Sequence, residues 1–288
     1  MQRSRRRSLR SNENSSEISS KPFLGFKEEP AGAMGFAPIV ANDCALGKTP
    51  VCHQGSSHLI SIGQTGSGKT NLMIANLLSY RGSVIVFDGR GDAARATARY
   101  RREVLKQEVF TLDPFGVTGL PTARLDPLDL YKLPRIEIES EAQSIATTIG
   151  IGHRSERDPY WAAQAESLIA SAVAHLLTRP DPEHRSINNL IDMLYNDECA
   201  YHIATLLDSE VAKDSFAYSG LAAFVQLPDG TSNTRYCVLS TAHSMLHTFR
   251  SRSIRDSMGP STLPLRDLLN GRPMTIYIVL PVERLSSH

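Results

Sequence analysis

The stretch that decides the fold of this chain reads Gly63-Gln64-Thr65-Gly66-Ser67-Gly68-Lys69-Thr70. It fits the pattern G-x-x-x-x-G-K-[ST], in which glycines let backbone N–H groups approach phosphate oxygens and the next helix points its positive end at the anion. In such a P-loop the lysine reaches the β- and γ-phosphates and the Ser/Thr hydroxyl coordinates Mg²⁺. We therefore expect these eight residues to bind ATP or GTP, with Lys69 on the phosphates and Thr70 on Mg²⁺.

The residues around the P-loop predict an α/β doubly wound domain. Residues 58–62 form a short β-prone run before it, and residues 71–78 have helical apolar spacing after it. Two more apolar runs, 83–87 and 108–112, are typical of strands buried in a parallel sheet, and a polar helix over 93–106 joins them. Ligands of such sheets collect at the carboxyl ends of the strands.

Helical patterns then replace the strand pattern until the chain nears its end, where residues 275–281 return to a strand. The sheet is therefore expected to resume after a helical insertion. Helices are predicted at 141–149, 160–177, 186–194, 200–207 and 242–249. The predicted organisation is a disordered basic tail (1–20), a lead-in segment (21–57), the first part of a nucleotide-binding domain (58–130), an all-α domain (131–262) and a return to the nucleotide-binding domain (263–288).

The composition excludes several classes of protein. The 31 Lys+Arg and 30 Asp+Glu leave a net charge of +1, so a nucleic-acid or membrane partner would have to meet a local patch. No apolar run approaches the roughly 20 residues that span a bilayer. The cysteines lie far apart without zinc-site spacing, which indicates reduced thiols in a cytoplasmic protein. The arginine-rich first residues favour a disordered tail, and a basic arm that binds acidic lipid or nucleic acid is the alternative.

Acidic residues end two of the predicted strands. Asp88 follows four apolar residues as a Walker B carboxylate would, so it is a candidate catalytic or metal-binding acid, but a terminal Asp also caps loops. Asp113 precedes a proline, which is ordinary turn chemistry. His243 and His247 lack the Glu of an H-E-x-x-H zinc site, so a metal role is not predicted. Trp161, in the first turn of a predicted helix, is expected to pack in a core.

Taken together, these segments resemble the VirD4/TraG coupling-protein ATPases of type IV secretion and conjugation. The resemblance covers about residues 57–285. Where the family commonly reads Asp-Pro-Lys-Gly-Glu, this chain reads Asp88-Gly89-Arg90-Gly91-Asp92. Apart from the P-loop, the segments that carry the resemblance are 76–83, 86–92, 109–114, 127–129, Asp158 with Trp161, and 275–281.

The resemblance implies a RecA-like P-loop sheet interrupted by an all-α domain. It also implies ATP and Mg²⁺ as cofactors and assembly into hexamers. Such hexamers pass relaxase-bound single-stranded DNA or protein cargo to the secretion channel at the inner face of the bacterial cytoplasmic membrane. The helical domain would contact that cargo. We expect a location in the bacterial cytoplasm, or at the periphery of the inner membrane.

Two departures from the family affect the expected membrane attachment and the expected activity. Members usually begin with transmembrane helices, which this sequence lacks. In the family, the strand resembling 275–280 is followed by the Walker B acids and an arginine finger, and neither region is present here. Because losing such groups can slow phosphoryl transfer by roughly three to five orders of magnitude, we expect weak or no ATPase activity from this chain alone.

Two other functions compete with that of an ATP-driven motor. A truncated, non-hydrolysing module that binds nucleotide or cargo is the alternative that stays open. A P-loop kinase or GTPase is disfavoured, because no Asn-Lys-x-Asp segment for reading guanine occurs.

Overall fold

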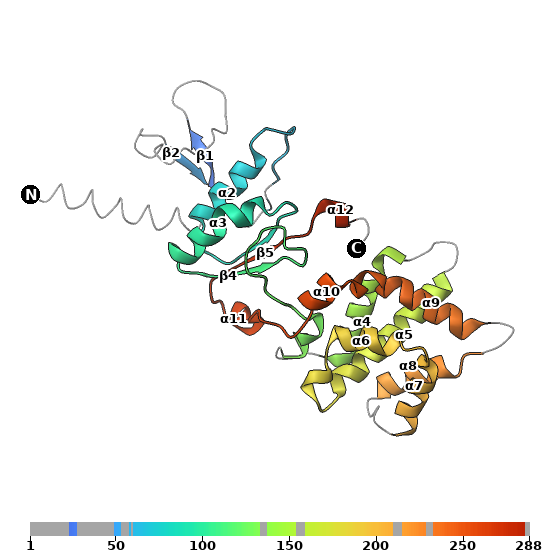
Figure 1. The fold of residues 1–288 in the computed structure, drawn as a ribbon. Helices are drawn as coiled ribbons and strands as arrows, with labels where there is room; N and C mark the ends of the chain where they lie inside the picture. The colour runs from blue at the N-terminus through green and yellow to red at the C-terminus, as the bar shows by residue number, and fades with distance from the viewer. Residues whose placement is uncertain are drawn as a thin grey trace, which may run out of the picture. The chain divides into compact units, whose positions relative to one another are not determined.

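The computed structural model describes residues 23–27, 49–52, 58, 60–132, 137–153, 159–209, 215–228 and 233–285. The chain divides into two compact units, drawn in Figure 1. We call them the sheet unit and the helical unit and describe each by itself. The sheet unit comprises Met1–Thr111, Gly116–Pro121 and Asn270–Pro281. The helical unit comprises Leu112–Phe115, Thr122–Leu269 and Val282–His288.

A three-stranded sheet lies at the centre of the sheet unit. Its strands are β3 (Val84–Phe87), β4 (Glu108–Leu112) and β5 (Met274–Ile278), in the order β3-β5-β4. Strand β5 runs parallel to β3, so a strand from the end of the chain lies between two strands from its first half. The prediction that the sheet resumes after the helical region is therefore confirmed.

Two helices pack on this sheet. They are α2 (Lys69–Ser79) and α3 (Asp92–Glu103), which also contact each other. The alanines of α3 that face the core are almost completely buried, so the helix backbone approaches the sheet closely. A buried hydrogen bond of 2.5 Å joins Thr97 Oγ1 to Tyr277 Oη. The core residues are Leu77, Val86, Ala93, Ala94, Ala98, Tyr277 and Val279.

The predicted strand at 58–62 is wrong in this structure. Residues 60–62 are irregular, and Ile60 and Ile62 are 83% and 92% exposed. A strand is stabilised by hydrogen bonding to a neighbouring strand, and no strand in the described part of the chain pairs with these residues. Phe87 of β3 is likewise 77% exposed.

A separate antiparallel pair lies in the predicted lead-in segment. It consists of β1 (Phe23–Lys27) and β2 (Thr49–Cys52), with Lys27 opposite Thr49. The predicted basic tail at 1–20 lies outside the described residues.

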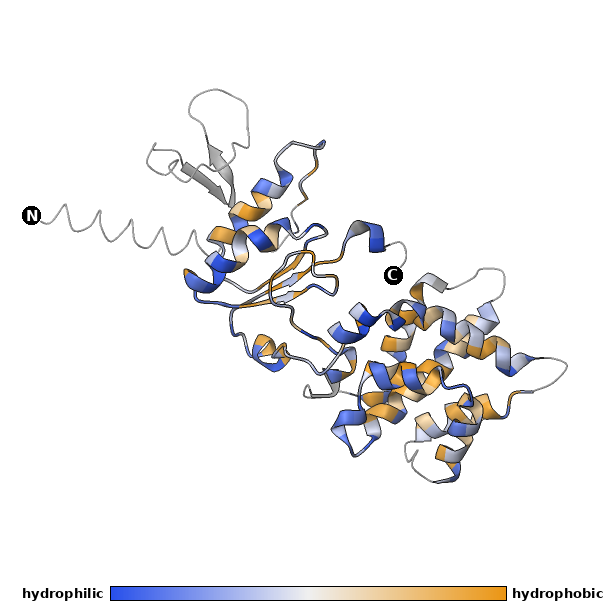
Figure 2. Cartoon of the chain, in the orientation of Figure 1, coloured by the Kyte–Doolittle hydropathy of each residue, from blue (hydrophilic) through white to orange (hydrophobic). Residues whose placement is uncertain are grey.

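The helical unit is organised around α5 (Pro159–Thr178), which contacts α4, α6, α8 and α9. Residues 168–177 of α5 are all buried, so this part of the helix has no solvent-facing side. Figure 2 shows hydrophobic helix faces gathered inside this unit. The other α-helices of this unit are α4 (Ile138–Gly150), α6 (Ile187–Leu194), α7 (Cys199–Asp208), α8 (Ser215–Val225), α9 (Thr234–Leu246), α10 (Arg252–Ser257), α11 (Leu265–Leu269) and α12 (Val282–Leu285). The short 3₁₀ helices are η2 (Pro127–Lys132), η3 (Ile151–His153), η4 (Pro182–His184) and η5 (His247–Arg250).

The five helices predicted in this region all form, with shifted ends. The one expected at 242–249 begins earlier, as α9, and its last residues belong to η5. Helix α8 was not predicted. It packs so closely on α5 that a Cβ added at Gly220 would lie 1.8 Å from Ser171 Oγ.

Two further observations concern the helices and the cysteines of the described residues. Within the described residues, none of the helices combines the length and apolar character that crossing a bilayer requires. Cys199 and Cys237 are free thiols, and burial raises the pKa of Cys199 to about 11, which keeps this thiol protonated and unreactive near neutral pH.

Candidate functional site

The backbone of the P-loop needs glycine at defined positions. Gly66 and Gly68 have φ angles of +86° and +87°, in the left-handed region where an L side chain costs about 1–2 kcal/mol. A Cβ at Gly63 would lie only 2.5 Å from Ser67 Oγ. The backbone conformation of the loop therefore requires glycine at these positions of the motif.

The exposed side chain of Lys69 lies back across the loop. Its Nζ donates to the carbonyl oxygen of Gly63 at 2.6 Å, to that of Gln64 at 2.9 Å and to Ser67 Oγ at 3.4 Å. The Ser67 N–H also donates to the Gln64 carbonyl oxygen at 3.2 Å. The structure thus brings four of the eight predicted site residues into mutual contact around one ammonium group.

Helix α2 begins within the P-loop motif, at Lys69. Gly68 is its N-cap residue, and its carbonyl oxygen accepts the N–H of Leu72 at 2.9 Å. The first turn contains no acidic side chain, so nothing within α2 competes with an incoming anion for the free N–H groups. Thr70 is an exposed residue of this turn, and Thr65 is an exposed residue of the loop. The loop and the first turn of α2 are therefore accessible from solvent.

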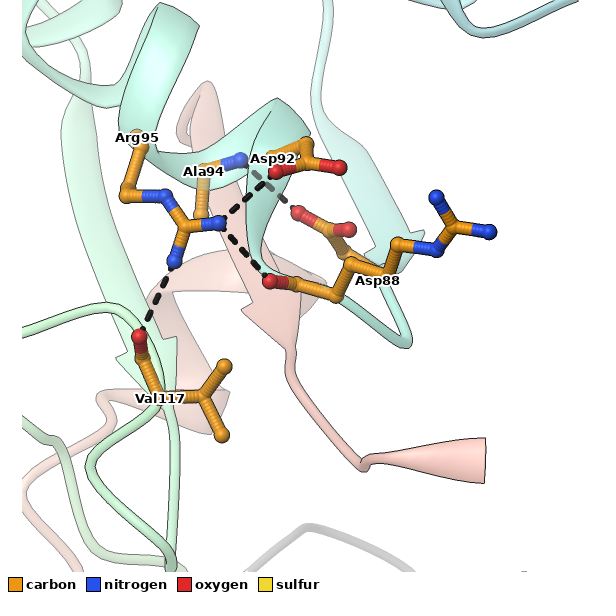
Figure 3. A network of polar contacts seen from close by, with 6 residues as sticks. Asp88, Asp92, Ala94, Arg95 and Val117 are labelled. Carbon is orange, nitrogen blue, oxygen red and sulfur yellow. Dashed lines mark hydrogen bonds and ion pairs between the residues drawn. The ribbon is translucent and has the colours of Figure 1, made fainter. Parts of the chain in front are cut away.

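Asp88 is tied to the start of α3 (Figure 3). Its Oδ2 accepts the N–H of Ala94 at 2.9 Å, and its own N–H donates to the Ile278 carbonyl oxygen at 2.9 Å. Since Gly91, the N-cap residue, has no side chain, the buried carboxylate supplies the cap and an opposite charge for the helix N-terminus. This geometry favours the capping interpretation of Asp88.

Arg95 fixes the same turn from its other side, a role that the sequence did not reveal. Figure 3 shows its guanidinium between α3 and the loop after β4. It donates to the Val117 carbonyl oxygen at 2.9 Å, to Asp92 Oδ1 at 2.7 Å and to the Arg90 carbonyl oxygen at 3.0 Å. The turn that resembles the family's Asp-Pro-Lys-Gly-Glu segment is therefore held as one rigid unit.

Polar residues in or next to the segments of the resemblance have structural roles in the helical unit. Asp126 accepts the N–H of Leu128 at 2.9 Å and that of Ile187 at 3.2 Å, which anchors η2 to the start of α6. Asp129 accepts the N–H of Ser261 at 3.3 Å. Asp113 is buried at the end of β4. The 127–129 element is thus a packing junction.

His243 and Trp161 are also engaged in packing contacts. His243 Nε2 lies 2.7 Å from the Leu194 carbonyl oxygen, and its ring stacks on Tyr195 at 4.0 Å between centroids. Trp161 is partly buried against the core of the helical unit. In the described part of the chain, no group of three or more metal-ligating side chains is placed to hold a metal ion.

Comparison with known proteins gives a consistent set of relatives. The family "Type IV secretory system Conjugative DNA transfer" matches residues 24–288. The chain is 23% identical over 236 residues to the conjugal transfer protein TraG of Escherichia coli, covering 79% of this chain and 36% of TraG. It is 22% identical over 272 residues to the type IV secretion system-coupling protein VirD4 of Bartonella henselae, covering 93% of this chain and 41% of VirD4.

Solved structures of the conjugative coupling protein TrwB share the fold. The unbound form matches with a TM-score of 0.50 at 15% identity, over 76% of this chain and 45% of TrwB. TrwB in complex with the GTP analogue GDPNP also has a TM-score of 0.50, at 16% identity, over 78% of this chain and 47% of TrwB. The chain spans less than half the length of each of these proteins. The match to the family extends over nearly all of the sequence, and the chain belongs to the type IV secretory system conjugative DNA transfer family.

Proposed function

We propose that this chain is the nucleotide-binding part of a type IV secretion coupling protein and binds ATP with Mg²⁺ at residues 63–70. The observation that supports this most is the position of Lys69. Its ammonium is held by the Gly63 and Gln64 carbonyl oxygens within a loop of left-handed glycines, directly before the free N–H groups of α2. This combination of cation, backbone donors and helix end suits a phosphate chain.

Lys69, Thr70 and the start of α2 have distinct parts in nucleotide binding. Lys69 exchanges its carbonyl partners for β- and γ-phosphate oxygens, and the first N–H groups of α2 bind the same phosphates. The Thr70 hydroxyl is the protein ligand of Mg²⁺. ATP with Mg²⁺ supplies the phosphoryl group whose transfer would drive cargo movement. The cargo would be a relaxase with its single-stranded DNA, or a protein, delivered to secretion-channel components by a homo-oligomer.

Nucleotide binding without turnover is the second candidate function. It is supported by the engagement of Asp88, whose Oδ2 is committed to the Ala94 N–H at the start of α3. A carboxylate held in this way caps the helix rather than orienting an attacking water. We therefore expect weak or no hydrolysis by this chain alone, with a motor function depending on further acidic and arginine groups.

Titration of the purified chain with a fluorescent ATP analogue tests the binding proposal. We expect saturable binding that Lys69→Ala abolishes and that Thr70→Ala makes insensitive to Mg²⁺. Arg99→Ala is the matched control, since it removes an exposed cation of α3 in the same unit and should leave the affinity unchanged. Equal binding by Lys69→Ala and the unmodified chain would contradict the proposal.

Phosphate release with and without single-stranded DNA separates the two candidates. DNA-stimulated release that Lys69→Ala removes would support the motor. Binding without release, even at high protein concentration, would support the non-hydrolysing module.

A further inference from the structure

A pocket of about 220 Å³ lies in the helical unit. It is formed where the end of α5 meets η4, α6 and α7. This volume is larger than a single bound water needs, so the pocket has room for a small ligand or for several waters. The polar side chains that line it include His175, Arg179, His184, Asn189, Asn196 and His202.

His175 is the unusual residue of this pocket. Its side chain is only 1% exposed, yet neither Nδ1 nor Nε2 has a hydrogen-bond partner. Buried polar groups are nearly always paired, so a ring with two unpaired nitrogens indicates a missing partner. The Nε of Arg179, one turn further along the chain, is also buried without a partner. Unpaired donors from two side chains therefore line the same pocket.

The charges around the pocket favour an anion. The one acidic side chain among the lining residues is Asp192, and both of its oxygens lie 2.8 Å from Nη2 of Arg255. Its charge is thus balanced from outside the lining. His184 faces Asp181 at 3.8 Å, and His202 is exposed. Arg179 remains as the permanent cation of the lining.

The helix ends do not contribute to this attraction. The pocket lies at the carboxyl ends of α5 and α6, where backbone carbonyls carry partial negative charge. Any anion must therefore be attracted by the side chains. This makes binding depend strongly on Arg179, whose forked guanidinium suits oxyanions.

We propose that this pocket binds a small oxyanion of the phosphate class, with Arg179 donating charge-assisted hydrogen bonds and the His175 ring donating one more. Burial first, and then the neighbouring Arg179 and His202, lower the pKa of His175, so its ring is neutral near pH 7 and has one N–H to donate. A bound anion would favour the protonated ring and raise this pKa.

Titration with inorganic phosphate, followed by NMR of ¹⁵N-labelled histidine rings, tests the proposal. The experiment uses the full chain carrying Lys69→Ala, so that phosphate binding at the P-loop neither masks nor mimics the effect. It is run in a buffer free of other oxyanions, and His175→Gln identifies the His175 signals. We expect a saturable shift of those signals and a rise in the pKa of His175.

Variants of Arg179 test whether phosphate binding depends on this side chain. Arg179→Gln should weaken phosphate binding by about tenfold or more, since it removes a charged donor. Arg179→Lys, which keeps the charge but loses the fork, should weaken it less and serves if Arg179→Gln does not fold. Arg99→Gln is the matched control and should change nothing.

Three results would overturn the proposal. One is the absence of a saturable shift at His175 in the chain and in both Arg179 variants, which would leave water as the partner of the ring. Another is a shift that Arg179→Gln leaves unaltered, and the third is a shift that Arg179→Lys leaves unaltered as well. A parallel titration with succinate distinguishes phosphate ligands from carboxylate ligands, because stronger binding of succinate would assign the site to carboxylates.

Discussion

The Nε of Arg101 donates to Thr275 Oγ1 at 2.6 Å and joins α3 to β5 across 174 positions of sequence. The guanidinium has no solvent exposure. Its other nitrogens donate to the carbonyl oxygens of Leu77, of Tyr80 at 2.9 Å and of Gly82 at 3.1 Å. One buried cation thus satisfies the carbonyl end of α2 and fixes both α2 and β5 to α3.

Arg101→Met should therefore destabilise the sheet unit strongly. The change removes the guanidinium donor from the Leu77 and Tyr80 carbonyl oxygens and from Thr275 Oγ1, and we expect a loss of about 3 kcal/mol or more in the free energy of unfolding. Arg99→Met, on the exposed side of the same helix, should have little effect. Hydrogen exchange of the β5 amides measured across a urea series reports on this unit directly. Equal protection in both variants would show that Arg101 is dispensable.

Gly68→Ala tests whether the loop backbone requires glycine. An added methyl would meet no atom within 4 Å, so the cost is backbone strain alone, about 1–2 kcal/mol at this φ of +87°. We expect a lower melting temperature and weaker binding of a fluorescent ATP analogue. Gly152→Ala is the control, because that glycine also has open space but no left-handed φ. If both variants behave alike, strain at Gly68 is not what the motif requires.

Asp88 variants separate helix capping from a role in nucleotide chemistry. Asp88→Ala removes the acceptor for the Ala94 N–H and should cost about 0.5–2 kcal/mol of stability. Asp88→Asn keeps a neutral acceptor, so we expect smaller losses of stability and an unchanged affinity for nucleotide with Mg²⁺. Urea unfolding and nucleotide titration are measured on both variants. A stable Asp88→Asn protein that no longer distinguishes nucleotide with and without Mg²⁺ would instead assign the carboxylate to the metal.

His175 predicts how stability depends on pH. Burial, then Arg179 and His202, hold the pKa of this ring below its usual value in the folded chain. As the pH falls through about 6.5, the unfolded chain therefore takes up a proton that the folded chain does not. The stability contributed by the neutral ring is complete above that pH and is lost below it.

The corresponding measurement is the melting temperature at pH 7.5 and at pH 5.5, in a buffer without oxyanions. We expect a drop on acidification that is smaller in His175→Gln, because glutamine does not titrate. His247→Gln, which changes an exposed histidine, should keep the full drop. A drop of the same size in His175→Gln would mean that other groups cause it.

Much of the fold could be predicted where local sequence decides the structure. The strand at 108–112 and the helix α5 were predicted within a residue or two of their ends, because long apolar runs with a clear period leave few alternatives. The segment 58–62 was predicted as a strand from the same kind of pattern. It is irregular because a strand also needs a neighbour to pair with, and that depends on the rest of the sheet.

The burial and the partners of polar side chains were the hardest features to predict from the sequence. Arg101 lies in a helix rich in charged residues, and only its helical spacing from Ala94, Thr97 and Ala98 places it on the buried face. The unpaired ring of His175 and the glycine contact that brings α8 onto α5 depend on segments distant in sequence. The sequence pattern of α8, mixed small and apolar residues, has no marked helical period.

The sequence by itself determined the P-loop, because left-handed glycines, a helix start and a following lysine are all properties of eight consecutive residues. It also determined membership of the family, through the order of such segments along the chain. Only the tertiary structure decided that Asp88 caps α3, that Arg101 lies in the core and that His175 faces a pocket without a partner. The physical reason is that burial and pairing of a polar group are set by the elements packed around it, which lie far away in the sequence.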